Sequence, residues 1–165
     1  MSNQIVTTGI SFFGAGTLKN FNEEIKNNGF QRIFIIANPE FQNALKKISS
    51  MLAKNKIVYS IFDRVSQTAS LSDTRAALNA AKTLRADAVI SVGSKSVSDI
   101  SKAVSLLLSN PEISDPRKLE GKAKPKNKAI PLYMFFTSIG NAWDSSHIFI
   151  LEDESQRKKI ECEDI

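Results

Sequence analysis

Short apolar runs rich in β-branched residues alternate along the chain with segments whose apolar positions recur at helical spacing. The apolar runs are residues 32–37, 57–62, 86–92 and 130–136, and the helical segments are 18–28, 40–54, 73–84 and 97–109. Such alternation predicts an α/β fold with a Rossmann-like, mostly parallel sheet and helices on both of its faces. The run at 32–37 is apolar on both faces, as expected of a strand that is covered on both sides.

The two ends of the chain carry strand signals of another kind. Residues 5–13 alternate loosely and are rich in β-branched side chains, which predicts an edge strand or hairpin. Residues 148–151 and 158–162 flank a polar turn and predict a terminal β-hairpin. We expect Thr17 and Ser72 to cap the helices that follow them, and Pro131 to lie at the start of its strand.

The segment at 86–107 is the one around which the chain is organised. Its turn, residues 93–96, joins an apolar strand to a helix with an apolar face formed by Val97, Ile100, Val104 and Leu107. In an open α/β sheet, such a turn lies at the carboxyl end of a strand and directs helix N–H groups at a bound phosphate. Any βα unit also needs a small-residue turn for structural reasons alone, so both interpretations stay open.

The composition predicts one soluble domain spanning residues 1–165, with 42% hydrophobic and 24% charged residues. No apolar run approaches the roughly 20 residues that span a bilayer, and the N-terminus has no leader pattern. We therefore expect a cytoplasmic protein with no membrane partner. Cys162 is the only cysteine, which excludes an intrachain disulfide and fits a reducing compartment.

The excess positive charge gathers in one stretch of the chain, although the formal net charge of +5 applies to the whole. Its basic residues are Arg117, Lys118, Lys122, Lys124, Lys126 and Lys128. A nucleic-acid site would favour aromatic residues interleaved with the basic ones. No aromatic residue lies in this stretch. We interpret the stretch as a solvated crossover loop and expect no nucleic-acid partner.

Few residues of the chain are suited to catalysis. His147 is the only histidine, so no histidine pair can bind a metal, and we expect it to be structural or exposed. The acidic clusters at 152–154 and 161–164 are typical of a solvated turn and terminus. The chain contains no nucleophile elbow, no Walker phosphate loop and no paired cysteines. Its own residues thus predict a phosphate-binding turn without catalytic groups.

Several stretches together resemble the N-terminal, dinucleotide-binding domain of the iron-containing alcohol dehydrogenase family. Residues 13–18 are similar to the family's Phe-Gly-x-Gly-x-Leu, and 92–103 to its Val-Gly-Gly-Gly-Ser-x-x-Asp with the following Lys-Ala. Residues 136–144 fall on Pro-Thr-Thr-x-Gly-Thr-Gly-Ser-Glu, and 150–159 resemble the next hairpin, whose lysine lies near the cofactor. The resemblance implies NAD or NADP as cofactor, held by Asn38, Thr68, Gly93, Ser94, Lys95, Ser96, Asp99, Thr137, Ser138, Asn141 and Lys159.

Departures from the family pattern predict that this cofactor is bound weakly. Ser94 and Lys95 stand where the family has glycines that let the backbone approach a pyrophosphate. Asn38 replaces the aspartate that binds the adenosine ribose, so we expect less preference for NAD over NADP. Residues 67–70 lack the family's Pro-Asn-Pro-Thr, and Trp143 and Asp144 replace a small residue and a glutamate.

The resemblance also implies what this chain lacks. In the family, a helical domain supplies an aspartate and three histidines to the metal, and we expect that domain to be absent from this protein. We therefore predict no metal-ligating and no catalytic residue in this chain. Two hypotheses remain: the cofactor half of an oxidoreductase that is inactive alone, with a separate helical domain as partner, or a degenerate module kept for binding or assembly. The resemblance and the unpaired strand at 5–12 further predict a homodimer.

Overall fold

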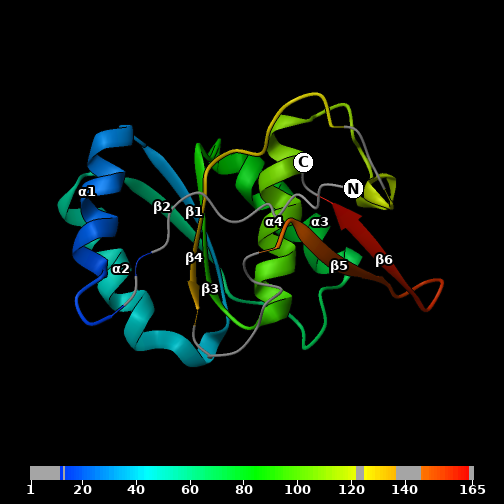
Figure 1. Cartoon of the computed structure of the whole chain (residues 1–165), viewed down its shortest axis with the longest axis horizontal. Helices are drawn as coiled ribbons and strands as arrows, with labels where there is room; N and C mark the ends of the chain where they lie inside the picture. Colours follow the sequence, from blue (N-terminus) through cyan, green and yellow to red (C-terminus); the bar gives the residue numbers. More distant parts are fainter. Residues whose placement is uncertain (1–11, 13, 122–124, 137–145, 164–165) are drawn as a thin grey trace, which may run out of the picture.

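The computed structural model describes residues 12, 14–121, 125–136 and 146–163, and it confirms the predicted α/β architecture (Figure 1). The four strands of the central sheet are β1 (Arg32–Ala37), β2 (Val58–Phe62), β3 (Ala88–Gly93) and β4 (Leu132–Phe136). All pair in parallel, in the order β2-β1-β3-β4. The central strands β1 and β3 are almost wholly buried, which explains why both are apolar on both faces.

Helices cover both faces of the sheet. α1 (Leu18–Asn28) and α2 (Gln42–Lys54) cover one face, and α3 (Leu71–Leu84) and α4 (Lys95–Ser109) the other (Figure 1). Two hydrophobic cores result, one beneath each helix pair. Two short 3₁₀ helices, η1 (Pro39–Phe41) and η2 (Pro116–Leu119), lie in the connections.

The terminal hairpin forms a further layer on the side of α4 that faces away from the sheet (Figure 1). Its strands are β5 (Ile148–Asp153) and β6 (Lys158–Glu163), which pair antiparallel as predicted. Enclosed between sheet, α3 and hairpin, α4 buries every side chain from 96 to 107. Buried polar groups need partners, and the Lys102 Nζ donates hydrogen bonds to the Ser146 and Ile148 carbonyl oxygens, at 3.0 and 3.2 Å.

The predicted cap position is confirmed at Thr17 and wrong at Ser72. Thr17 directly precedes α1, although its backbone is helical and its side chain makes no capping hydrogen bond. The third helix begins one residue after Ser70, whose hydroxyl oxygen accepts a hydrogen bond from the Asp73 N–H at 3.0 Å. Ser72 lies inside the first turn, where its hydroxyl contacts Ser70. A serine three residues before an acidic residue is the stronger capping signal, and here that serine is Ser70.

Prolines mark two element boundaries. Pro39 opens η1, so the regular helix that we expected from residue 40 begins at Gln42. Pro131 directly precedes β4, as predicted, and its carbonyl oxygen accepts a hydrogen bond from the Val89 N–H at 2.9 Å. The predicted strand at 5–13 lies outside the described residues except for Phe12.

Candidate functional site

The turn between β3 and α4 lies at the carboxyl edge of the sheet, beside the end of β1. Gly93 has a φ of +149°, and a Cβ on it would come within 2.3 Å of the Asn38 Oδ1. The same Oδ1 accepts a hydrogen bond from the Ser94 N–H at 2.7 Å. Asn38, only 8% exposed, therefore holds the turn in place from the neighbouring strand. A contact between Asn38 and the cofactor remains a prediction. The contact that the structure shows is the hydrogen bond with Ser94 in the turn.

Two serine hydroxyls lie together at the start of α4. Ser94 is the residue before the helix, and its side chain makes no capping hydrogen bond. Instead its hydroxyl lies 2.9 Å from that of Ser96, which also donates to the Ser66 carbonyl oxygen at 3.3 Å. The Ser94 side chain therefore does not cap α4, and the dipole of a helix favours a phosphate at its N-terminus.

A cavity of about 220 Å³ opens beside this turn. Five predicted cofactor residues line it, and they come from three parts of the chain: Thr68, Lys95, Ser96, Asp99 and Lys159. Gln67, Ala69, Ile150 and Glu152 also line it, and none of them was among the predicted site residues. The position of Gln67 next to Thr68 in the sequence could have indicated that Gln67 lines the cavity. Ile150 and Glu152 line it only because the hairpin docks on α4.

An internal ion pair lies in the wall of this cavity. The Lys95 Nζ pairs with the Asp99 carboxylate one helical turn further on. Asp99 is only 4% exposed, and burial raises the pKa of its carboxyl above the ordinary value, although Lys95 opposes the shift. A hydrogen bond from the Ile150 backbone also favours the ionised form. Asp99 therefore joins the first turn of α4 to strand β5.

The remaining predicted site residues fall into two groups. Asn38, Gly93 and Ser94 meet at the turn itself, next to the cavity wall formed by Lys95 and Ser96. Thr137, Ser138 and Asn141, together with Trp143 and Asp144, lie outside the described residues. His147 is exposed, as expected. Among the described residues, no group of three or more histidine, cysteine, aspartate or glutamate side chains is arranged to hold a metal ion.

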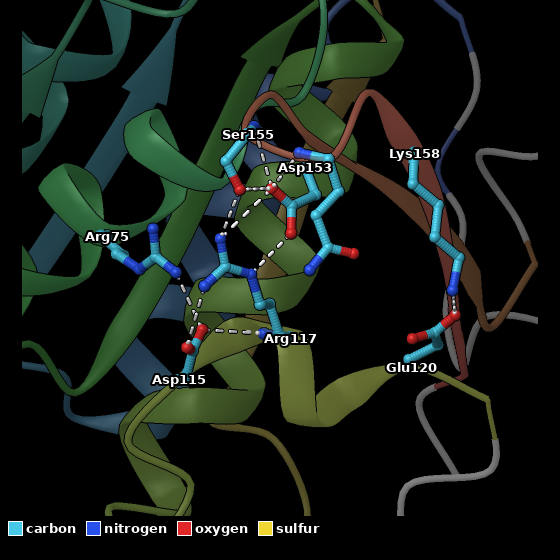
Figure 2. A network of polar contacts seen from close by, with 8 residues as sticks. Arg75, Asp115, Arg117, Glu120, Asp153, Ser155 and Lys158 are labelled. Carbon is cyan, nitrogen blue, oxygen red and sulfur yellow. Dashed lines mark hydrogen bonds and ion pairs between the residues drawn. The ribbon is translucent and has the colours of Figure 1, made fainter.

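A second polar cluster joins η2 to the hairpin (Figure 2). The Arg117 Nε donates to the Asp153 Oδ2 at 2.6 Å, and its Nη2 to Oδ1 at 3.2 Å. Arg117 and the Ser155 hydroxyl hold the pKa of the Asp153 carboxyl far below its usual range, and Asp153 is only 2% exposed. Arg75 and Arg117 also flank Asp115 and lower its pKa, together with a backbone hydrogen bond.

Two sequence interpretations are corrected by this cluster. The basic stretch does not begin as a solvated loop, because Arg117 packs against the hairpin as an ion-pair partner. The acidic cluster at 152–154 is not simply a solvated turn, because Asp153 is buried and the Glu154 carboxylate contacts the Ser72 hydroxyl. Lys122 and Lys124 lie outside the described residues.

Neither Cys162 nor the described helices change this description of the site. Cys162 is buried in the core between α4 and the hairpin, and burial raises the pKa of its thiol to about 12. Because a buried thiol with a raised pKa is rarely ionised, Cys162 is a packed and unreactive residue. No helix within the described ranges is both long and apolar enough to cross a bilayer.

Comparison with known proteins agrees with this geometry. Lactaldehyde reductase of Escherichia coli is 25% identical over 166 residues, covering 99% of this chain and 44% of the relative. A crystal structure of 1,3-propanediol oxidoreductase superposes with a TM-score of 0.91 at 18% identity, covering 99% of this chain and 43% of that one. Sulfoacetaldehyde reductase from Bifidobacterium kashiwanohense, in complex with NAD⁺, gives 0.78 at 16% identity, with 92% and 40% covered.

These relatives are all more than twice as long as the matched segment, so the chain spans less than half of their length. The structural likenesses lie below 25% identity and show the fold. The family model for iron-containing alcohol dehydrogenase matches residues 9–164, which is nearly the whole sequence. The chain therefore belongs to the iron-containing alcohol dehydrogenase family, and it corresponds to that family's N-terminal α/β domain.

Proposed function

We propose that this chain is the NAD(P)-binding half of an iron-containing alcohol dehydrogenase-type oxidoreductase. The observation that carries the proposal is the cavity at the carboxyl edge of the sheet, where Thr68, Lys95, Ser96, Asp99 and Lys159 come together. Ligands of open α/β sheets bind at this edge. The NAD⁺ complex of the sulfoacetaldehyde reductase adds support, because that protein shares the fold.

The cavity fits part of such a cofactor. Its volume of about 220 Å³ lies below the roughly 300–1,000 Å³ typical of small-molecule sites. It can accept the diphosphate and the groups next to it, with Lys95, Lys159 and the Ser96 hydroxyl as partners. A bound nicotinamide cofactor would donate or accept the hydride, and the chain's own residues would hold and orient it. We propose no metal-dependent step, because the sequence has one histidine.

We expect the binding to be weak. The Ser94 N–H could donate a hydrogen bond to a phosphate oxygen, but it already donates one to the Asn38 Oδ1. The Ser94 side chain would crowd a phosphate that approaches the turn where the family has glycine, and the Lys95 ammonium is paired with Asp99. A flexible lysine also loses rotamer entropy when it binds, so it does not replace several converging backbone donors.

Calorimetric titration of the purified chain with NAD⁺ and with NADP⁺ tests the proposal. We expect weak binding, strengthened in the Ser94→Gly plus Lys95→Gly variant, and a smaller preference for NAD⁺ than the family's aspartate-bearing members show. Micromolar binding by the parent chain that is lost in Lys95→Ala would instead make Lys95 a working phosphate ligand. If neither the parent nor the glycine variant binds a dinucleotide, the alternative of a non-catalytic module kept for assembly is favoured.

We also propose that the isolated chain does not turn over alcohols. The resemblance to the family implies that the metal ligands lie in a separate helical domain. The single histidine of this sequence, His147, is exposed. Small alcohols and aldehydes should give no change in nicotinamide absorbance with this chain, with or without added iron or zinc. Metal-dependent turnover would contradict this expectation, whereas activity gained on adding a helical partner would support the two-part oxidoreductase.

A further inference from the structure

Lys95 is the departure from the family pattern whose surroundings the structure describes in detail. Its side chain is 37% exposed, and its ammonium pairs with the Asp99 carboxylate, which is 5% exposed. Both side chains line the cavity beside the turn. The chain has therefore added a cation to the wall of the cavity, and the buried carboxylate on the same helix face already neutralises that cation.

Charged groups on three elements surround this pair. Lys102 lies one turn further along α4, and its ammonium is bound to the carbonyl oxygens of Ser146 and Ile148. From β5 come the Ile150 backbone, which hydrogen-bonds Asp99, and the Glu152 carboxylate. From β6 come Lys159, in the cavity wall, and the buried Cys162 thiol, whose pKa the Asp99 charge helps to raise. The Lys102 charge also favours the ionised form of Asp99, but the ion pair that the structure shows with Asp99 is that of Lys95.

An anion that enters the cavity meets two obstacles at Asp99. It must draw the Lys95 ammonium away from its present partner, and it must then lie near a buried negative charge. We propose that Asp99 competes with the ligand's phosphate for Lys95 and thereby determines how strongly the cavity holds an anion. The inference rests on the proposed function in one respect only, which is that the anion is the diphosphate of a dinucleotide.

The Asp99→Asn variant tests this competition. Asparagine has nearly the same shape, and its amide oxygen can still accept the hydrogen bond from Ile150. We expect the affinity for sulfate, measured by titration calorimetry at neutral pH, to rise by about tenfold or more. Adding Lys95→Ala to Asp99→Asn should cancel most of that gain, because the released ammonium is then missing.

The matched control is Glu152→Gln. Glu152 lines the same cavity, so this change removes the same charge without touching the ion pair. We expect a clearly smaller gain in sulfate affinity than Asp99→Asn gives. An equal gain in both variants would overturn the proposal, because the general negative charge of the cavity would then be sufficient. No gain in a folded Asp99→Asn chain, checked by circular dichroism, would overturn it as well.

A pH titration gives a second test, in which protonation rather than substitution removes the Asp99 charge from the parent chain. Sulfate keeps its charge from neutral to mildly acidic pH, while the raised pKa of Asp99 lets this carboxyl protonate as the pH falls. Sulfate affinity should then increase in the parent and in Glu152→Gln, and the increase should be much smaller in Asp99→Asn. Equal slopes in the three proteins would contradict the proposal.

Titration with NAD⁺ separates this inference from the proposed function. If Asp99→Asn binds sulfate more tightly and binds NAD⁺ as well, both are supported. If it gains sulfate affinity but binds no dinucleotide, Asp99 is the competitor and the proposed cofactor is wrong. If the parent chain binds NAD⁺ and the variant gains affinity for neither ligand, the proposed function stands and the competition is disproved.

Discussion

Gly93 lies so close to Asn38 that the turn between β3 and α4 has no room for a Cβ atom at this position. A Cβ on Gly93 would lie 2.3 Å from the Asn38 Oδ1 and 3.2 Å from the Asn38 backbone nitrogen, and the φ of +149° is unfavourable for other residues. We expect Gly93→Ala to lower the free energy of unfolding by about 2–4 kcal/mol, from backbone strain and overpacking together.

The control for this change is Gly29→Ala at the end of α1. Gly29 has a φ of +67° but no atom within 4 Å of the added Cβ, so only the backbone penalty of about 1–2 kcal/mol applies. Urea unfolding of both variants measures the difference. Equal destabilisation would show that the close approach of Asn38 does not contribute.

Which residues enter the candidate site was predictable only in part. Thr68, Lys95, Ser96, Asp99 and Lys159 were named from the motif resemblance, and the structure brings them to one cavity. The role of Asn38 was not predictable, because its hydrogen bond to Ser94 joins residues 56 positions apart. The same holds for Asp99, since no pattern in the sequence says that the hairpin will cover it.

Helix starts offer a comparison between two serines that occupy the same capping position. Ser70 accepts a hydrogen bond from the Asp73 N–H at the start of α3, whereas Ser94 makes no capping bond at the start of α4. We expect Ser70→Ala to cost about 1 kcal/mol of stability and Ser94→Ala a few tenths, read from urea midpoints. A larger loss in Ser94→Ala would mean that its hydroxyl supports the turn through Ser96.

Strands and helices followed from periodicity more closely than their ends did. The predicted runs at 32–37 and 97–109 agree with β1 and with most of α4, because continuous apolar runs and helical spacing reflect burial against a sheet. The helix starts depended on which of several nearby serines or threonines finds a free N–H. Such local competition, at Thr17 and at Ser70 against Ser72, is not decided by spacing alone.

An ion pair between segments far apart in sequence ties the third layer of the molecule to η2. Arg117 of η2 holds Asp153 at the end of β5 (Figure 2). The same hairpin carries Glu152 and Lys159 into the cavity wall. Sequence patterns could not show this, because a basic run and an acidic turn are each typical of solvated surface. Only the docking of the hairpin on α4 buries Asp153 and makes its charge depend on Arg117.

This arrangement predicts how the stability of the whole chain changes with pH. The folded-state pKa of Asp153 is lowered, so its ion pair stabilises the fold fully above the ordinary aspartate pKa. That contribution is lost progressively as the pH falls from there to the lowered folded-state pKa. Arg117→Met should therefore lower the urea midpoint strongly at about pH 7 and less at about pH 3, where the parent has lost part of the contribution of its ion pair and Asp153 in the variant is protonated. Asp115, which Arg117 also contacts, changes in the same direction.

Lys158→Met is the matched control, because it removes a cation from the same region without exposing a buried charge. Its ion pair with Glu120 has both side chains about half exposed, and such pairs contribute roughly 0–1 kcal/mol. Its urea midpoint should stay close to that of the parent at both pH values. If the deficit of Arg117→Met is as large in acid as at neutral pH, Arg117 acts through packing, and the hairpin is held on α4 by its apolar residues and by Lys102 instead.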